Sequence, residues 1–97
     1  MLVLITYDIS LINSQGQRRL RSIAKTCLDY GMRVQQSVFE CEVDPAQWIL
    51  LKNELLSLYQ PEEDSLRFYF LGKQGRRKVE HHGAKSSPDI IRDTLLI

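Results

Sequence analysis

The sequence has little cysteine and no long hydrophobic run. Its two cysteines, Cys27 and Cys41, do not have metal-ligand spacing and lie on predicted apolar faces, so we expect buried thiols rather than a disulfide. No apolar run approaches the ~20 residues that span a membrane. The first residues lack a basic flank and a small-residue cleavage site, which favours a strand over a signal peptide. Together these absences predict a protein of the reducing cytoplasm without a membrane partner.

The familiar motifs of several enzyme classes are also missing. The chain has no G-x-S-x-G nucleophile turn, no glycine-rich phosphate loop ending in Lys-Ser and no H-E-x-x-H zinc motif. His81 and His82 are adjacent, so on a strand they would point to opposite faces, and we interpret them as surface residues. The candidate chemistry therefore rests on carboxylates and basic side chains.

The length and composition indicate one small globular domain over residues 1–97. The chain is 43% apolar and 26% charged, which is ordinary for such a domain. A chain of this size buries roughly 60–65% of its unfolded surface, so its core is modest. An exposed apolar face would gain stability from a second subunit.

The net charge of +1 conceals a strong segregation of charge along the chain. Residues 40–64 carry seven acidic side chains against Lys52 alone. Two other segments, 15–33 and 73–85, are basic, and their cations are Arg18, Arg19, Arg21, Lys25, Arg33, Lys73, Arg76, Arg77, Lys78 and Lys85. Two basic segments on a nearly neutral chain indicate a surface for a polyanion, and the alternative is an ordinary solvated surface.

The chain begins with a nearly continuous apolar run, Leu2 to Tyr7, that ends at Asp8. Such a run is typical of a strand buried on both faces. A carboxylate at the end of a rigid central strand can stay hydrated while its backbone is held, which suits a metal ligand. The alternative interpretation is that Asp8 only ends the strand.

Two helices are predicted by their caps and apolar stripes. Ser14 and Gln17 have the spacing of a capping box, and the stripe that follows ends near Gly31. The second helix has Asp44 as its cap, Pro45 in its first turn and Gln47 reaching back. The stripes consist of Leu20, Ile23, Ala24, Cys27 and Leu28 in the first helix, and of Trp48, Leu51, Leu55, Leu58 and Tyr59 in the second.

The remaining segments read as strands and turns. Residues 33–43 are extended, with a bend expected at the polar Gln36-Ser37, and residues 66–70 alternate as a strand. Residues 62–64 predict a solvated acidic turn. Weaker patterns suggest a short strand at 78–82 and a terminal strand at 90–97.

This order predicts an α+β fold, a ferredoxin-like βαββαβ sandwich with two helices on one face of an antiparallel sheet. The other face would need a cover, and a homodimer stacked sheet on sheet would bury Val34, Val38 or Tyr69. The apolar tail, residues 85–97, would then add a swapped strand to the partner's sheet.

The strand residues also show a family resemblance. The segments 4–8, 33–40 and 65–72 resemble the small CRISPR-associated nucleases of the "Cas two" family, in the right order and over nearly the whole chain. Residues 79–85, Val-Glu-His-His-Gly-Ala-Lys, resemble its subtype I-C branch. The resemblance implies a ferredoxin-like homodimer and a metal-dependent endonuclease that cleaves phosphodiester bonds in RNA or DNA.

The resemblance also implies roles for individual residues. Asp8 would be the catalytic ligand of a magnesium or manganese ion, shared with Asp8 of the second subunit. Arg19, Arg21 and Arg33 match basic positions of the family and would bind nucleic acid. The basic segments add Arg18, Arg76, Arg77 and Lys78 as candidates for that binding. Tyr7, Ser37 and Phe39 would set the geometry of the site. Such a metal ion needs only one or two carboxylates in addition to waters and phosphate oxygens.

A second role implied by the resemblance is that of an adaptor in CRISPR spacer acquisition. It would bridge two dimers of the integrase "Cas one" and hold duplex DNA through phosphate contacts, which carry no sequence information. The two roles are compatible, and the sequence does not choose between RNA and DNA. The alternative is a non-catalytic ferredoxin-like dimer that binds nucleic acid or a small ligand.

Overall fold

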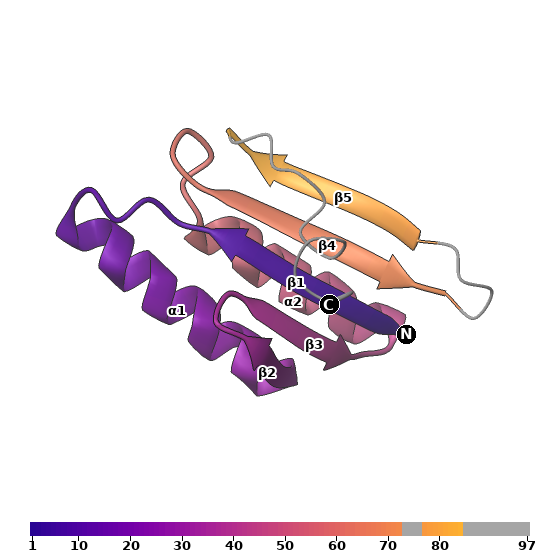
Figure 1. Ribbon diagram of the computed structural model, residues 1–97. Helices are drawn as coiled ribbons and strands as arrows, with labels where there is room; N and C mark the ends of the chain where they lie inside the picture. Colours follow the sequence, from indigo (N-terminus) through magenta and orange to yellow (C-terminus); the bar gives the residue numbers. More distant parts are fainter. Residues whose placement is uncertain (73–76, 85–97) are drawn as a thin grey trace.

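The structure, a computed structural model, describes residues 1–72 and 77–84. Its strands form one antiparallel sheet in the order β2-β3-β1-β4-β5, and both helices lie on the same face of that sheet (Figure 1). This arrangement confirms the predicted α+β, ferredoxin-like fold. In chain order the elements are β1 (Leu2–Asp8), α1 (Ser14–Tyr30), β2 (Gly31–Gln35), β3 (Val38–Glu42), α2 (Pro45–Leu58), β4 (Ser65–Leu71) and β5 (Arg77–Gly83).

Strand β1 is the centre of the sheet, as its unbroken apolar run predicted. It pairs with β3 on one side and with β4 on the other, and Val3 to Tyr7 are all buried. The last residue of the strand, Asp8, is exposed. The predicted bend at Gln36-Ser37 is confirmed as the turn between β2 and β3, and the predicted strand at 78–82 is confirmed as β5.

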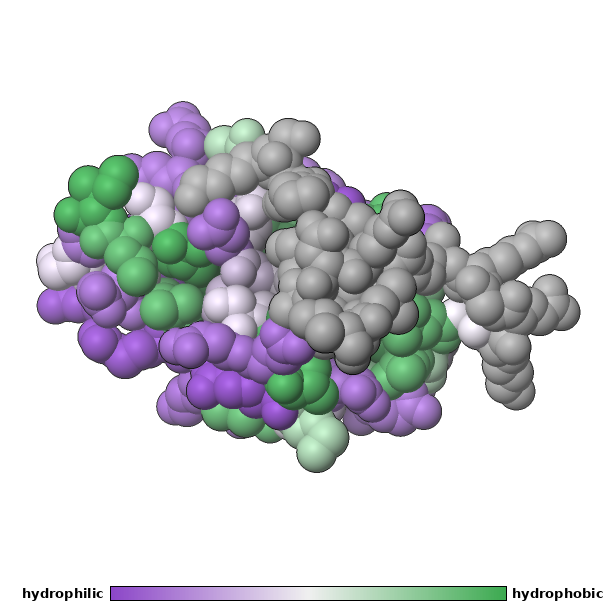
Figure 2. Space-filling model, in the orientation of Figure 1, coloured by the Kyte–Doolittle hydropathy of each residue, from purple (hydrophilic) through white to green (hydrophobic). Residues whose placement is uncertain are grey.

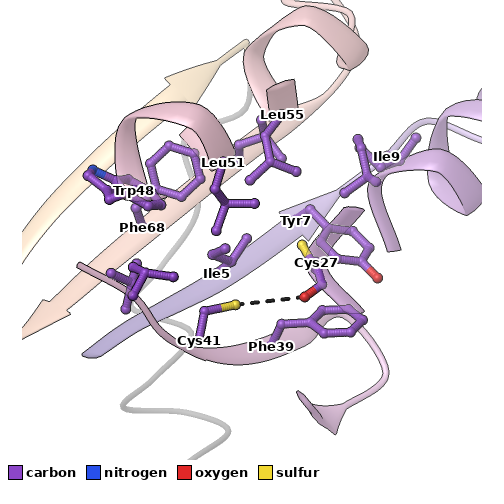
Figure 3. Packing of buried hydrophobic residues seen from close by; sticks show 14 residues of the cluster. Ile5, Tyr7, Ile9, Cys27, Phe39, Cys41, Trp48, Leu51, Leu55 and Phe68 are labelled. Carbon is purple, nitrogen blue, oxygen red and sulfur yellow. Dashed lines mark hydrogen bonds between the residues drawn. The ribbon is translucent and has the colours of Figure 1, made fainter. Parts of the chain in front are cut away.

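The hydrophobic core fills the space between the sheet and the two helices (Figure 3). Ile5 of β1 and Phe39 of β3 are fully buried there, and the Trp48 ring of α2 meets the Phe68 ring edge to face with 4.9 Å between centroids. Burial of each large side chain of this kind contributes about 1.5–3 kcal/mol. The other side chains of this core include Val3, Ile23, Cys27, Cys41, Leu51, Leu55 and Leu66.

Both cysteines are buried in this core and are free thiols, as predicted. The Cys41 Sγ lies 3.9 Å from the Cys27 carbonyl oxygen, toward which it donates a weak hydrogen bond (Figure 3). Burial raises the pKa of Cys41 to about 11 and also raises that of Cys27. At neutral pH both thiols are therefore protonated and chemically quiet.

The helix caps confirm one prediction and correct another. Helix α2 has the predicted capping box, with Asp44 Oδ1 accepting from the Gln47 amide at 2.7 Å. The prediction that Ser14 caps α1 was wrong, because Asn13 Oδ1 accepts from the Gly16 amide at 3.1 Å instead. Both residue types make good caps, and the path of the preceding loop decides between them.

The sheet face opposite the helices is also partly buried. Leu4, Thr6, Val38 and Tyr69 are each at most 6% exposed within the single chain. Val38 and Tyr69 therefore need no partner subunit for their burial, in contrast to what their hydrophobicity suggested. Exposed apolar side chains remain on the strands at both edges: Met32, Val34 and Val79.

Several predictions lie outside the described residues. These are the tail at 85–97 with its terminal strand, and the cations Lys73, Arg76 and Lys85. In the segments that the structure does describe, neither helix combines the length and hydrophobicity that crossing a membrane requires.

Candidate nucleic-acid and metal site

A cavity of about 390 Å³ opens at the carboxyl end of β1, between α1 and the turn that joins β2 to β3. Three separate parts of the chain meet there because β1 ends beside the β2–β3 turn, and α1 packs over that end of the sheet (Figure 1). Five residues singled out in the sequence line this cavity: Tyr7, Asp8, Arg21, Arg33 and Ser37. Its other lining residues are Ile9, Leu11, Leu20, Ala24 and Gln36.

Tyr7 ties the floor of the cavity to the β2–β3 turn. Its amide donates to the Ser37 carbonyl at 3.2 Å, and its hydroxyl donates a long hydrogen bond, 3.4 Å, to the Gln36 carbonyl. Its ring stacks beside that of Phe39, with 6.1 Å between centroids (Figure 3). Burial raises the pKa of Tyr7, and the hydrogen bond with Arg33 offsets part of that rise. Tyr7 and Ser37 thus line the cavity, and Phe39 lies beside Tyr7 in the core; their role in the geometry of the site stays a prediction.

Two guanidinium groups border the cavity from different elements. The Arg33 guanidinium lies over the Phe39 ring, 5.0 Å from its centroid, a cation–π contact that fixes its orientation. Arg21 reaches the cavity from α1, and both arginines are exposed. Guanidinium groups bind phosphate oxygens through paired hydrogen bonds. The cavity therefore has the cations that a phosphate group needs.

Asp8 also lines the cavity, at the end of β1. It pairs with Ser65 in the β1–β4 register, and strand alternation directs it to the face opposite Tyr7, which the helices do not cover. Within residues 1–72 and 77–84, no three His, Cys, Asp or Glu side chains cluster as a metal site. A hydrated magnesium or manganese ion suits one exposed carboxylate, and a second carboxylate would have to come from another copy of the chain.

Arg19, two residues before Arg21, occupies a different environment. Its Nε donates to Asp64 Oδ2 at 2.7 Å, and its Nη2 donates to Glu63 Oε2 at 3.1 Å. Its side chain is 15% exposed. A phosphate would have to compete with two carboxylates for this guanidinium, so the structure does not place Arg19 at the cavity.

Asp64 is the centre of this second cluster, and its burial contradicts the predicted solvated turn. The side chain is fully buried, and besides Arg19 it accepts from the Ser10 amide at 2.9 Å and the Gln60 amide at 2.8 Å. Burial alone would raise its pKa, but these hydrogen bonds outweigh burial and lower it. Asp64 thereby anchors the loop that follows Asp8.

Gly16 holds the same loop from the helix side. A Cβ built at this position would collide with the Ser10 carbonyl oxygen, so the loop and the first turn of α1 are in backbone contact. Together with Asp64, this contact fixes the path of residues 9–13. Asp8 is therefore held by a strand before it and an anchored loop after it.

The remaining predicted cations are spread over other surfaces. Arg18 and Lys78 are exposed and do not line the cavity. Arg77 begins β5, and Arg76 lies outside the described residues. These positions stay predictions for nucleic-acid contact.

Sequence reasoning missed the apolar wall of the cavity and one further arginine. Leu20 and Ala24 were assigned only to the core stripe of the first helix, although they are partly buried and also line the cavity. Arg67 lies on the same sheet face as Asp8, and its guanidinium is 5.5 Å from the centroid of the Tyr69 ring. Its alternation with Leu66 and Phe68 was the available signal for that placement.

Comparison with known proteins agrees with this arrangement. Residues 1–79 match the family model described as CRISPR associated protein Cas2. The chain is 59% identical over 97 residues to the CRISPR-associated endoribonuclease Cas2 of Chlorobaculum tepidum, with all of both chains covered. It is 57% identical over 96 residues to the CRISPR-associated endonuclease Cas2 of Halalkalibacterium halodurans, with 99% of each chain covered.

A solved structure supports the same assignment. The crystal structure of Streptococcus pyogenes Cas2 at pH 6.5 superposes with a TM-score of 0.70 at 51% sequence identity. The match covers 75% of this chain and 88% of the Streptococcus chain. With the matched family model and these relatives, the chain belongs to the Cas2 family of CRISPR-associated proteins.

Proposed function

We propose that this chain is a metal-dependent endonuclease of a CRISPR system that cleaves phosphodiester bonds in RNA or DNA. The observation that carries the proposal is the juxtaposition of Asp8, Arg21 and Arg33 around one cavity at the end of a rigid strand. The relatives named endoribonuclease and endonuclease support the reaction class.

Different residues of the chain would bind the phosphate, hold the metal ion and position the rim of the cavity. Arg21 and Arg33 would bind the phosphate group, and the stacking of Arg33 on Phe39 reduces the rotamer freedom lost when the phosphate binds. Asp8 would hold a magnesium or manganese ion, which supplies charge stabilisation and an activated water when bound. Tyr7 keeps the β2–β3 turn, and with it the rim of the cavity, in place.

A homodimer formed through the sheet face opposite the helices would supply the second carboxylate. Asp8 lies at the end of that face, and the exposed apolar side chains of Met32 and Val79 lie on the same face by strand alternation. Exposed apolar side chains on one face favour association with a second copy. A two-fold axis near Asp8 would bring the two carboxylates together.

The second candidate function is that of a DNA-binding adaptor between dimers of the integrase "Cas one". The exposed cations Arg18 and Lys78 lie outside the cavity, so they are available to contact the phosphates of a duplex without taking part in cleavage. We propose the cytoplasm as the site of both activities, since the thiols of Cys27 and Cys41 are free.

The deciding experiment compares Asp8→Asn with wild type in nuclease and integration assays run side by side. Asparagine keeps the size of the side chain but removes the charge, so metal-dependent cleavage should fall by at least about 100-fold. Integration and DNA bridging should persist, because other surfaces supply the cations. Glu62→Gln, at an exposed carboxylate in the α2–β4 turn, is the matched charge control. Cleavage by Asp8→Asn at the wild-type rate would exclude Asp8 as the ligand.

The dimer is tested by placing a charge on its proposed interface. Val79→Glu should weaken the dimer in sedimentation velocity, since an unpaired charge would be buried against the second subunit. Ile49→Glu is the matched control, because Ile49 is exposed on α2 at the opposite side of the molecule. An unchanged sedimentation coefficient for Val79→Glu would argue against this face as the interface.

A further inference from the structure

The two arginines of the cavity and the carboxylate of Asp8 approach the end of β1 from different sides of the sheet. Arg21 belongs to α1, and Arg33 lies over the ring of Phe39, which is packed in the core between the sheet and the helices. Asp8 follows Tyr7, a residue of that core, so strand alternation directs Asp8 to the opposite face. A phosphate bound to an ion at Asp8 would therefore meet a different set of side chains on this second face.

Arg67 of β4 shares this face with Asp8. In the β1–β4 register Asp8 lies opposite Ser65. Arg67 lies two residues farther along β4, opposite Thr6, so it is a diagonal neighbour of Asp8. Diagonal neighbours in an antiparallel sheet lie roughly 7–8 Å apart, which is within reach of a long side chain. Phe68, the next residue of β4, is buried in the core on the helix side, in agreement with this alternation.

The position of Arg67 is fixed by its strand and by an aromatic ring. Strand β4 is paired on both sides, with β1 and with β5, so its backbone is not at an edge of the sheet. The guanidinium carbon lies 5.5 Å from the centroid of the Tyr69 ring, within the range of a cation–π contact, and Tyr69 is fully buried. Arg67 is itself only half-buried, so part of its side chain stays accessible.

The strand register places one carboxylate next to Arg67. The neighbouring positions on this face are Leu4, Thr6 and Asp8 of β1, Ser65 and Tyr69 of β4, and Val79, His81 and Gly83 of β5. Asp8 is the acidic residue of that set. Within residues 1–72 and 77–84, the Thr6 and Tyr69 hydroxyls are buried without a hydrogen-bond partner. Figure 2 shows polar residues, pale to purple, at the end of β1 beside the hydrophobic β1–α1 loop. This end of the face therefore offers an anion several donors beside Asp8.

We propose that Arg67 is a further residue of the Asp8 site, where it balances the carboxylate charge before a divalent ion binds and then contacts the phosphate. A positive charge about 8 Å from a divalent ion repels it even in water, so Arg67 keeps the affinity of the free protein for the ion low. A phosphate brings negative charge that attracts both cations. The ion and the phosphodiester therefore bind cooperatively. This inference rests on the proposed function, because it takes Asp8 as the ligand of the ion.

The first test measures manganese binding to the full chain without nucleic acid, by electron paramagnetic resonance. Arg67→Gln removes the charge, so it should bind manganese at least about threefold more tightly than wild type. The difference should disappear at about 1 M salt, where the screening length is about 3 Å. Arg67→Lys keeps the charge and should bind manganese as wild type does. Loss of a merely structural residue would weaken manganese binding or leave it unchanged.

Two further variants control this titration. Lys25→Gln removes the same charge from an exposed position on α1, on the other side of the sheet, and should leave the manganese affinity unchanged. Circular dichroism checks that Arg67→Gln is folded. If it melts well below wild type, Arg67→Met replaces it, because methionine keeps an unbranched apolar stem against Tyr69 without the charge.

The second test measures binding of an oligonucleotide of mixed sequence in the absence of divalent ions. Arg67→Gln should weaken this binding at least about fivefold, because one charge-assisted phosphate contact is lost. Arg67→Lys should retain most of the affinity. Tighter binding of the ion together with weaker binding of the oligonucleotide is the combination that distinguishes the proposed role of Arg67 from a general loss of structure.

The outcomes separate this inference from the proposed function. If Asp8→Asn loses manganese but Arg67→Gln binds it no more tightly than wild type, the role of Arg67 is overturned and the metal site at Asp8 stands. Unchanged oligonucleotide binding by Arg67→Gln would overturn the phosphate contact. If Asp8→Asn binds manganese as wild type does, the proposed function and this inference are both overturned.

Discussion

Arg19 and Arg21 lie two residues apart on α1 and carry the same charge, but the fold gives them different environments. Arg19 is 15% exposed and donates to the carboxylates of Asp64 and Glu63. Arg21 is exposed and borders the cavity that contains Asp8. One arginine therefore belongs to the anchor of the β1–α1 loop, and the other belongs to the candidate site.

The comparison shows that a basic segment is not one functional unit. Whether a guanidinium is held in an internal ion pair or is accessible to a ligand depends on whether a carboxylate from a distant part of the chain is buried beside it. Asp64 is such a carboxylate, and its hydrogen bonds to the Ser10 and Gln60 amides hold it in place for Arg19. No acidic side chain lines the cavity except Asp8 among the residues that the structure describes.

The largest effect is expected from breaking the anchor at Asp64. Asp64→Ala would leave the Ser10 and Gln60 amides without their acceptor and Arg19 without its buried partner. Removing one partner of a buried ion pair costs on the order of 3 kcal/mol, which urea denaturation would detect. Glu62→Ala, in the same turn but exposed, is the control. Equal free energies of unfolding for Asp64→Ala and wild type would mean that the Asp64 anchor does not contribute to stability.

Acid should weaken the anchor at Asp64. The pKa of Asp64 lies below its ordinary value of 3.8, so its contribution to the free energy of unfolding is complete well above that value and is lost as pH falls through it. Asp64→Asn should therefore show a shallower decline of stability below about pH 5 than wild type does. The pKa of Glu80 is also lowered, because hydrogen bonds from His82 and Lys52 outweigh its burial.

Glu80→Gln separates the contributions of Asp64 and Glu80 to the loss of stability at acid pH. If the acid decline belongs to Asp64, Glu80→Gln keeps most of it and Asp64→Asn removes it. The reverse pattern in acid titrations followed by circular dichroism would assign the decline to Glu80 and its two partners.

The comparison itself is tested by Arg19→Ala and Arg21→Ala. Arg21→Ala should weaken binding of a single-stranded oligonucleotide about tenfold, because one charge-assisted phosphate contact is lost. It should also reduce the salt slope of log affinity by about 0.7 and leave the melting temperature unchanged. Arg19→Ala should lower the melting temperature and keep the slope. If Arg19→Ala reduced the salt slope and Arg21→Ala lowered the melting temperature, the roles assigned to the two arginines would be reversed.

The smallest effect is expected at the outer partner of the anchor. The Glu63 side chain is 41% exposed, so water competes for its ion pair with Arg19. Glu63→Gln should shift the melting temperature by no more than about 4 °C. A loss as large as that of Asp64→Ala in differential scanning calorimetry would show that the two carboxylates act as one cluster.

The fold could be predicted from the sequence because its signals are local. The apolar run of β1, the box at Asp44 and Gln47, and the polar bend at Gln36-Ser37 each specify their own segment. Asp8, Arg21 and Arg33 were found by charge and by resemblance, and the fold brings them to one cavity. The subtype suggested by residues 79–85 stays a prediction.

The features that escaped prediction depend on contacts between distant residues. Asp64 looks like its exposed neighbours Glu62 and Glu63 in the sequence, and only its pairing with Arg19, 45 residues away, reveals it as buried. The apolar wall of the cavity escaped for a related reason. Leu20 and Ala24 serve the core and the cavity at once, and a helical stripe does not show where the core ends.

The central position of β1 has a consequence for the order in which a newly made chain acquires its activity. Asp8 is synthesised long before its pairing partners, because β1 pairs with β4, where Leu2 lies opposite Leu71. The hydrogen bond from the Ser10 amide likewise forms only after Asp64 has been synthesised. Pairing over such separations is slow and follows local helix formation. The carboxylate therefore cannot be held in its final position until β4 has left the ribosome, and nascent chains that end before β4 lack the completed site.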